Sequence, residues 1–276
     1  MTQSNNSSQT NTSNQNNCEC CWDAQEIQNL IETIKNKIRN LKGRKDRNDK
    51  EIEDRNDEGD EEIFDTQNIF ALCLNIRISG INNNGIPLDI CLIYKNSEGW
   101  KRRRINRKRF SNSLGNFLGL NNQKGIYIIF CNFFEKDCII YIGGQKPRSN
   151  RGLIERLKNF IKALMDGGRG HTGGLNIHNY IKNCIGNQAN NKNNKNLCLI
   201  VLAFPLKDNH NDKVYKVEGC FHSVYQNVYK CKCYRYYQFV RSASTADFTI
   251  FSNPNESKEV IKKIFEEIRK LCGGAS

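Results

Sequence analysis

The sequence predicts a mixed α/β (α+β) fold in which an antiparallel sheet is flanked by helices. Residues 125–130 and 138–144 are β-branched, aromatic-rich runs around a short polar break, which is the pattern of a hairpin. A continuous apolar run at 197–204 is typical of a buried strand. Apolar residues recur with helical spacing in three further stretches, 153–164, 212–229 and 256–271. We expect Ser149 or Asn150 to cap the first of these helices and a short helix to follow at 175–185.

Composition and charge divide the chain into six segments. Residues 1–17 are almost entirely Asn, Gln, Ser and Thr, so they cannot bury enough apolar area to fold. The segments are a disordered polar tail at 1–21, an amphipathic helix at 22–43, a charged linker at 44–63, an accessory β-hairpin with a basic segment at 64–120, a main domain at 121–254 and a C-terminal helix at 255–276.

The overall charge predicts the kind of partner. The 276 residues carry a formal net charge of +13, which favours contact with a polyanion such as DNA. No stretch of apolar residues is long enough to span a membrane, and the N-terminus has no secretion signal. We therefore expect a cytoplasmic protein, or a nuclear one if the host is eukaryotic.

The thirteen cysteines are expected to be reduced thiols in that compartment. Close-set Cys18, Cys20 and Cys21 are also a pattern seen in zinc sites, with Cys231 and Cys233 as a distant partner pair. Since no second cluster follows at the spacing of a zinc finger, the sequence leaves metal binding by these cysteines open.

An amphipathic helix is predicted to begin after Asp23, which can cap it, and to run to about Leu41. Its apolar residues follow a heptad-like stripe, of which Ile27 and Ile34 are members. The stripe has two interpretations. Either the helix docks on the body of the protein, or it joins two copies into a homo-oligomer.

Two predicted strands at 69–78 and 88–94 flank a turn at 81–85, and this hairpin either extends the main sheet or forms a separate unit. Seven of the nine residues from 101 to 109 are basic, which favours contacts with nucleic-acid phosphates over a solvated loop or a localisation signal. The predicted nucleic-acid-binding residues are Lys101, Arg102, Arg103, Arg104, Arg107, Lys108 and Arg109, together with Lys146 and Arg148 after the second hairpin.

Two tyrosines stand out in the hairpin of the main domain. A turn centred on Phe134 would place Tyr127 directly opposite Tyr141 on one face of the sheet. Such a pair is either part of the core or part of a site.

Charged residues downstream favour a site. Arg156 and Glu218 each lie at the edge of the apolar stripe of a predicted helix, so both can reach the sheet. His171 lies among five glycines in residues 166–174 and is either a surface histidine or a member of the same site.

Together these residues resemble the GIY-YIG nuclease family, most closely its restriction-type branch in loop layout. The resemblance rests on Gly125-Ile126-Tyr127, Tyr141-Ile142-Gly143, the Arg-Leu-Lys-Asn-Phe run that begins at Arg156, and Glu218 in a helix after a third strand. It implies that 121–254 is a nuclease domain with a small three-stranded antiparallel sheet flanked by helices. It also implies DNA cleavage with one divalent metal ion.

The resemblance assigns a role to each residue. Glu218 would hold Mg²⁺ or Mn²⁺, and Arg156 would stabilise charge on the scissile phosphate. Tyr127 would take the proton of the attacking water, with its phenolate favoured by Arg156 or Lys146. Tyr141 would orient the water or a phosphate oxygen, and His171 would contact phosphate or shuttle a proton.

This assignment predicts that both hydroxyls, the guanidinium and the carboxylate share one face of the sheet in a shallow, positively charged cleft. Two departures from the family pattern leave an alternative. Phe160 stands where several members have His or Tyr, and no Asn follows Glu218 by about a dozen residues. The alternative is a catalytically weak or inactive nucleic-acid-binding protein that keeps the nuclease fold.

Overall fold

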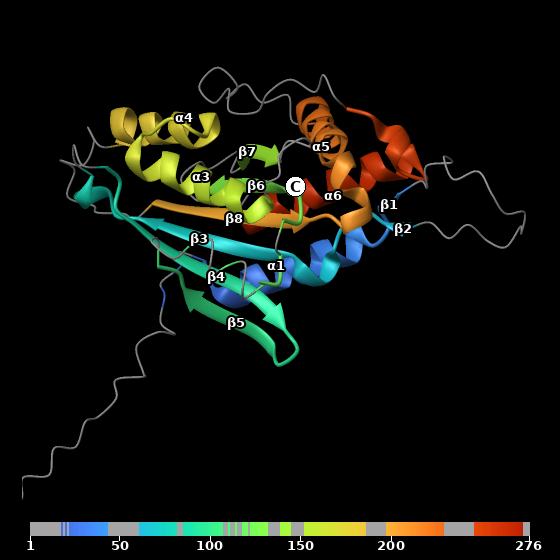
Figure 1. Ribbon diagram of the computed structural model, residues 1–276, viewed down its shortest axis with the longest axis horizontal. Coiled ribbons are helices and arrows are strands. Elements are labelled where there is room, and N and C mark those ends of the chain that lie inside the picture. The colour runs from blue at the N-terminus through green and yellow to red at the C-terminus, as the bar shows by residue number, and fades with distance from the viewer. Residues whose placement is uncertain are drawn as a thin grey trace, which may run out of the picture.

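The computed structural model is a mixed α+β structure (Figure 1). It describes residues 18, 20, 22–43, 61–81, 85–106, 110, 114, 118–120, 122–131, 139–144, 152–185, 197–228 and 246–272. Its helices are α1 (Ala24–Ile38), α3 (Leu153–Asp166), α4 (Thr172–Tyr180), α5 (Val214–Val228) and α6 (Pro254–Leu271). Its strands are β1 (Lys42–Gly43), β2 (Glu61–Glu62), β3 (Phe70–Ile76), β4 (Leu88–Asn96), β5 (Gly99–Arg104), β6 (Gly125–Cys131), β7 (Ile139–Gly144) and β8 (Leu197–Pro205).

One antiparallel sheet of six strands organises the molecule, in the order β5-β4-β3-β8-β6-β7. The expectation of a three-stranded sheet is therefore wrong. The accessory hairpin extends the main sheet because β3 pairs with β8 along its whole length, from Phe70↔Ala203 to Ile76↔Leu197. As a result β8 is a central strand, and all nine of its residues are buried, as its continuous apolar run predicts.

The sheet separates two hydrophobic cores. Alternate residues of each strand point to opposite faces, so neighbouring positions on β3, β8 and β6 contribute to different cores. Helices α1, α5 and α6 bury their apolar faces in the first core, and α3 contributes to the second. Figure 1 shows α3 and α4 lying together on one side of the sheet, with α1 against β3 and β4 on the other.

Helix α1 docks on the body of the protein, which is one of the two interpretations left open by the sequence. Asp23 and Glu26 form a capping box at its start. Its apolar stripe is buried and therefore already covered within the chain. An oligomer formed through α1 remains a prediction and would have to use the polar face of this helix.

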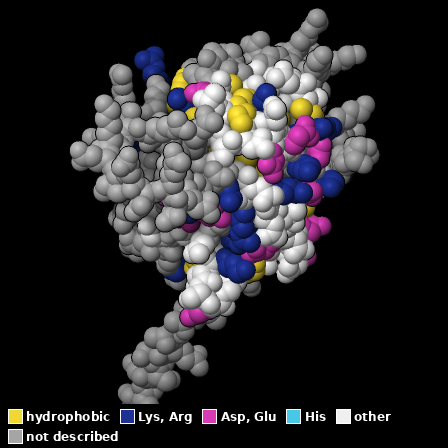
Figure 2. Space-filling model, turned by 90° about the vertical axis from the view of Figure 1, so that its right-hand side faces the viewer, with side chains coloured by type: hydrophobic (Ala, Val, Ile, Leu, Met, Phe, Trp, Pro, Cys, Tyr) yellow, Lys and Arg dark blue, Asp and Glu magenta, His cyan; other side chains and the backbone are white. Residues whose placement is uncertain are grey.

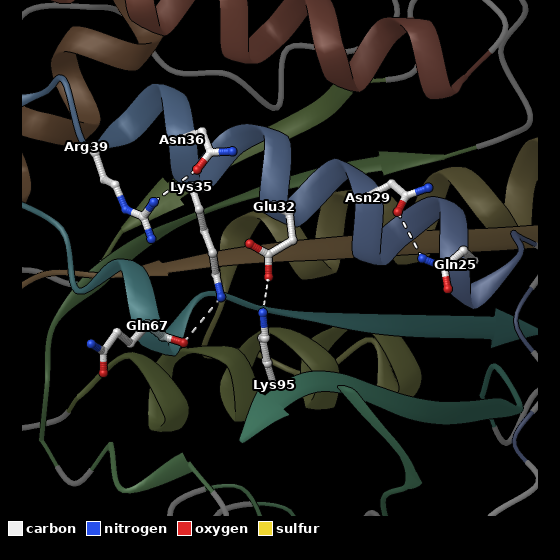
Figure 3. A network of polar contacts seen from close by, with 8 residues as sticks. All are labelled: Gln25, Asn29, Glu32, Lys35, Asn36, Arg39, Gln67 and Lys95. Atoms are coloured by element: carbon white, nitrogen blue, oxygen red, sulfur yellow. Dashed lines mark hydrogen bonds and ion pairs between the residues drawn. The ribbon is translucent and has the colours of Figure 1, made fainter. Parts of the chain in front are cut away.

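Polar contacts tie α1 to β4 and to the turn before β3 (Figure 3). The Lys95 ammonium on β4 lies 2.9 Å from a carboxylate oxygen of Glu32, and Lys35 donates a hydrogen bond of 3.4 Å to the Gln67 carbonyl. Burial lowers the pKa of Lys35.

Several predicted boundaries move in the structure. Helix α3 begins after Gly152, whereas the sequence predicted a cap at 149 or 150, which lie outside the described residues. Helix α4 begins at Thr172, earlier than the predicted helix at 175–185, because His171 caps it. Most of the predicted tail and linker also lies outside the described residues, although Ile63, at the end of the linker, is fully buried.

Disulfides join the N-terminal segment to the sheet. Cys18 is bonded to Cys91 and Cys20 to Cys73, so the prediction of reduced thiols is wrong for these four residues in this structure. The reason is the sheet register, which places Cys73 directly opposite Cys91 beneath that segment. Within the described residues, no helix combines the length and apolarity that a membrane crossing requires.

Candidate active site

The two tyrosines lie on adjacent strands, β6 and β7, but not directly opposite each other. The register pairs Tyr127 with Gly143 and Ile129 with Tyr141, so the predicted pairing is wrong by two residues. A bulge between Ile129 and Phe130 accounts for one residue of this shift, and the turn that would account for the other lies outside the described residues. The rings are diagonal neighbours instead, stacked with centroids 5.8 Å apart.

Two glycines make room for these rings. A Cβ atom on residue 143 would lie 2.8 Å from the Tyr127 hydroxyl oxygen and would also meet the ring of Tyr141. A Cβ atom on Gly173, near the start of α4, would meet the ring of Tyr141 from its other side. The glycine of the Tyr-Ile-Gly motif is therefore required by the close approach of both rings, and Gly173 lets α4 close over Tyr141.

His171 is part of this site. Its Nε2 lies 2.6 Å from the Tyr127 hydroxyl oxygen, and its Nδ1 accepts a hydrogen bond of 3.1 Å from the Gly174 amide at the start of α4. A neutral imidazole carries one proton, so an Nδ1 that accepts leaves the proton on Nε2. The Nε2–H group therefore donates to the Tyr127 hydroxyl oxygen, and the Tyr127 proton must point elsewhere.

Burial controls the protonation of these three side chains. Tyr127, Tyr141 and His171 are 0%, 9% and 2% exposed. Burial, assisted by the positive charge of Arg156, lowers the pKa of His171 to about 3, so this imidazole is neutral at physiological pH.

Burial also raises the pKa of Tyr127 well above its usual value, and that of Tyr141 to a lesser extent. Arg156 acts in the opposite direction on both phenols, as expected, but burial outweighs it. Hydrogen bonds with Tyr127 and Arg156 also lower the pKa of Tyr141. Lys146, the other cation proposed to favour the phenolate, lies outside the described residues.

Arg156 reaches the tyrosines from the first turns of α3. This helix ends at Asp166, where Gly167 adopts a left-handed conformation with φ of 65°. Arg156 is half-buried, and its Nε atom is buried without a hydrogen-bond partner among the described residues. A buried guanidinium nitrogen with no partner is costly unless a ligand satisfies it.

Glu218 approaches β7 from the other side of the sheet. A Cβ atom on residue 144 would lie 2.7 Å from its Oε2 atom, so Gly144 leaves the space that the carboxylate uses. Its Oε1 atom lies 3.5 Å from Nε2 of His222, one helical turn later on α5. The Glu218 side chain is 21% exposed.

The prediction that all these groups share one face of the sheet is wrong. Arg156 belongs to α3 and Glu218 to α5, and these helices pack in different cores. The groups nevertheless meet at β7 because it is an edge strand in which Gly143 and Gly144 face opposite sides. The charges of Arg156 and Glu218 both affect the pKa values of the two tyrosines, which places all four residues within electrostatic range.

Exposure differs across the residues that the sequence placed in one cleft. At the tyrosines and His171 the described residues are buried, whereas Arg156 and Glu218 reach solvent. Sequence reasoning missed His222 and Gly173. The four-residue spacing between Glu218 and His222 is a usable signal, because such residues are neighbours on a helix. Gly173 had no comparable signal, because only the packing of α4 on Tyr141 explains it.

Four of the nine predicted nucleic-acid-binding residues lie at the other edge of the sheet. Lys101 to Arg104 are in β5, and Lys101 and Arg104 form ion pairs with Glu98 and Asp89 at 2.9 and 3.5 Å. Five strand spacings separate β5 from β7, which corresponds to about 24 Å at about 4.8 Å each. Arg107, Lys108, Arg109, Lys146 and Arg148 lie outside the described residues.

Lys, Arg, Asp and Glu side chains are interspersed over the face of the molecule that carries β1 and β2, rather than separated into patches of one sign (Figure 2). Ion pairs such as Lys207–Glu62 at 3.5 Å are consistent with this mixture. Among the described residues of that face, positive charge is therefore not concentrated in one place.

Comparison of the chain with protein-family models, with curated proteins and with solved structures gave no match.

Proposed function

We propose that this protein is a divalent-metal-dependent DNA endonuclease that hydrolyses phosphodiester bonds. The observation that supports it most is the meeting of two tyrosines, an arginine and a glutamate at Gly143 and Gly144 of β7. We infer that β6, β7 and β8, with α3 and α5, correspond to the three-stranded nuclease core that the sequence resembles. A DNA substrate would place the protein in the cytoplasm or, in a eukaryotic host, in the nucleus.

The surroundings of Glu218 fit a magnesium or manganese ion. Its carboxylate is partly exposed and lies in space left by a glycine. Mg²⁺ is commonly held in proteins by one or two carboxylates and keeps several of its waters, so one carboxylate open to solvent suits it. Bound there, the ion would act as a Lewis acid toward the phosphate.

Arg156 is the proposed phosphate-binding residue. Its guanidinium presents several donors in a fixed plane, which matches the oxygens of a phosphate. The unpartnered, buried Nε atom is a donor that a phosphate oxygen would satisfy. This contact would hold the phosphate beside Tyr141, on whose pKa the charge of Arg156 acts.

The geometry leads us to exchange the roles of the two tyrosines. The resemblance assigned the role of general base to Tyr127. This residue, however, is fully buried, and its oxygen already accepts a hydrogen bond from Nε2–H of His171. Tyr141 retains some exposure and receives hydrogen bonds that favour its phenolate. We therefore propose that Tyr141 takes the proton of the attacking water. Tyr127 and His171 would hold the Tyr141 side chain in place.

A non-catalytic nucleic-acid-binding protein is the second candidate. It is favoured by the burial of Tyr127 and His171, since a closed aromatic cluster also stabilises a fold without any chemistry. The basic strand β5 would then carry the function alone.

A plasmid-nicking assay separates the two candidates. With Mg²⁺, we expect the wild-type protein to nick supercoiled DNA and EDTA to stop it. Glu218→Gln removes the metal-binding charge at nearly constant size, and we expect it to lower the rate at least about 100-fold, as expected when an electrostatic contribution to catalysis is lost. Arg156→Ala should have an effect of similar size.

The matched controls are Glu259→Gln on α6 and Lys158→Ala on α3, both on exposed parts of their helices. These should nick DNA at the wild-type rate. DNA binding without cleavage in Mg²⁺ or Mn²⁺ would favour the non-catalytic candidate.

A further inference from the structure

Cysteine sulfur atoms gather on the face of the sheet that α1 covers. Cys73 of β3 lies directly opposite Cys91 of β4, and Cys198 of β8 lies opposite Asn75, two residues from Cys73. Three adjacent strands therefore place cysteines on one face of the sheet, within two residues of one another along the strands. The segment before α1 adds Cys18 and Cys20 above them.

Three of these sulfurs lie at the mutual distances that ligands of one metal ion have. The Sγ atoms of Cys20, Cys73 and Cys198 all lie within 4.8 Å of one another, and those of Cys73 and Cys198 are 3.8 Å apart. Zinc–sulfur bonds of about 2.3 Å in a tetrahedron place neighbouring sulfurs about 3.8 Å apart. Cys20 and Cys73 form one disulfide and Cys198 belongs to another, so the structure brings the sulfurs of two disulfides to the spacing of metal ligands.

Asn75 gives a second, independent observation. It is 4% exposed, and its Oδ1 atom is buried without a hydrogen-bond partner among the described residues. It lies on the same face as the sulfurs, next to Cys73 along β3 and opposite Cys198. Its oxygen is therefore a further buried polar atom beside the sulfurs that the described residues leave unsatisfied.

We propose that, when its disulfides are reduced, this cluster binds one Zn²⁺ ion through the thiolates of Cys20, Cys73 and Cys198. Cys18 and Cys91 are adjacent and offer the fourth thiolate. Buried sites made only of thiolates favour zinc among the divalent ions that cells supply. The site is separate from Glu218 and serves the fold, because it fastens the start of α1 to β3 and β8.

The oxidised and reduced proteins would thus use the same sulfurs in different ways. In the structure, Cys20 and Cys73 are bonded to each other, and Cys198 is disulfide-bonded as well. Disulfides of this kind are rare where glutathione and thioredoxin keep thiols reduced. In such a compartment Cys20, Cys73 and Cys198 would be reduced, and their thiolates would then be available to bind a metal ion.

Metal analysis of the full-length protein tests this proposal. Protein purified in a reducing, zinc-containing buffer and then desalted should retain about one zinc ion per chain, as a closed thiolate site does. Replacing the zinc by Co²⁺ should give the strong visible absorption of tetrahedral cobalt thiolates. A zinc chelator should lower the melting temperature of the reduced protein, because binding free energy is also folding free energy.

Cys73→Ala and Cys198→Ala should each lose the bound metal. The matched control is Cys220→Ala, since Cys220 is a free, buried cysteine of the same core and burial raises the pKa of its thiol to about 12. The proposal would be overturned if the reduced wild-type protein retained no zinc, or if it contained iron instead of zinc. Zinc retained by both cluster variants would also overturn it. If these variants do not fold, the wild-type zinc content and cobalt spectrum decide.

Discussion

The position of one proton determines how the tyrosine cluster works. Because Gly174 donates to Nδ1 of His171, the Nε2 proton points at the Tyr127 oxygen. The O–H group of Tyr127 therefore points toward Tyr141. This direction agrees with the pKa of Tyr141, which a hydrogen bond with Tyr127 lowers. The donor chain runs from the buried histidine to the more exposed tyrosine, which is the end that a water molecule can reach.

This arrangement predicts a pH dependence. The pKa values of both phenols are raised above 10, so the phenolate is a minor species at neutral pH. As the pH rises toward the pKa, the phenolate fraction increases tenfold with each pH unit. Single-turnover cleavage should therefore rise from pH 7 to pH 9.5 with a slope of about one log unit per pH unit. Tyr141→Phe should lower the rate about 100- to 10,000-fold and remove this slope.

Tyr127→Phe should keep the slope, since it removes a supporting hydrogen bond rather than the base. Tyr215→Phe, an exposed position of α5, is the control and should behave as the wild type. The opposite pattern, in which Tyr127→Phe loses the slope and Tyr141→Phe keeps it, would return the base to Tyr127.

Among the elements, β5 is distinguished by its charge and its position at the edge of the sheet. It carries four consecutive basic residues, and two of them are neutralised by ion pairs with Glu98 and Asp89. Arg102 makes no ion pair with any residue that the structure describes. Edge strands rich in cations resist pairing with other chains, so the charge also has a protective role independent of DNA.

If β5 binds DNA phosphates, Arg102→Gln should weaken binding. We expect a several-fold loss of affinity at moderate salt and a decrease of about 0.9 in the slope of log affinity against log salt, which corresponds to one phosphate contact. The cleavage rate at saturating protein should not change, because β5 lies about 24 Å from β7.

Lys262→Gln on α6, where Lys262 pairs with Glu259, is the control for a general loss of charge. Equal effects of Arg102→Gln and Lys262→Gln would show that only net charge matters. A lower rate at saturation would show instead that β5 takes part in the chemistry.

The whole molecule is organised by β8, which joins the accessory hairpin to the strands of the candidate site. Both faces of β8 are buried, one in each core. Residues 64–104 therefore share a sheet and two cores with the segment predicted to be a nuclease domain.

A fragment of residues 121–276 should consequently fail to fold alone. Without β3, one edge of β8 would lose its backbone partners, and the apolar faces that β3 and β4 cover would be exposed to water. We expect no cooperative thermal transition and poor dispersion in the proton NMR spectrum. The full chain and a chain lacking only residues 1–17 should each unfold in one cooperative step. A cooperative transition of the fragment at the temperature of the full chain would contradict this view of the sheet.

Much of the local structure could be predicted from the sequence. The capping box at Asp23, the buried run of β8 and the stripe of α3 each follow from a few residues and a regular spacing. The residues of the candidate site could also be selected, because Arg156 and Glu218 lie at the edges of their stripes. These features are local, so the sequence by itself determined them.

Only the tertiary structure decided how these parts meet. The pairing of β3 with β8, which makes one six-stranded sheet, depends on contacts between residues more than 100 positions apart. Strand pairing with a bulge at Ile129 sets the tyrosine register, and burial sets the protonation of Tyr127 and His171. Pairing, register and burial arise from long-range packing, and for that reason no short stretch of sequence determines them.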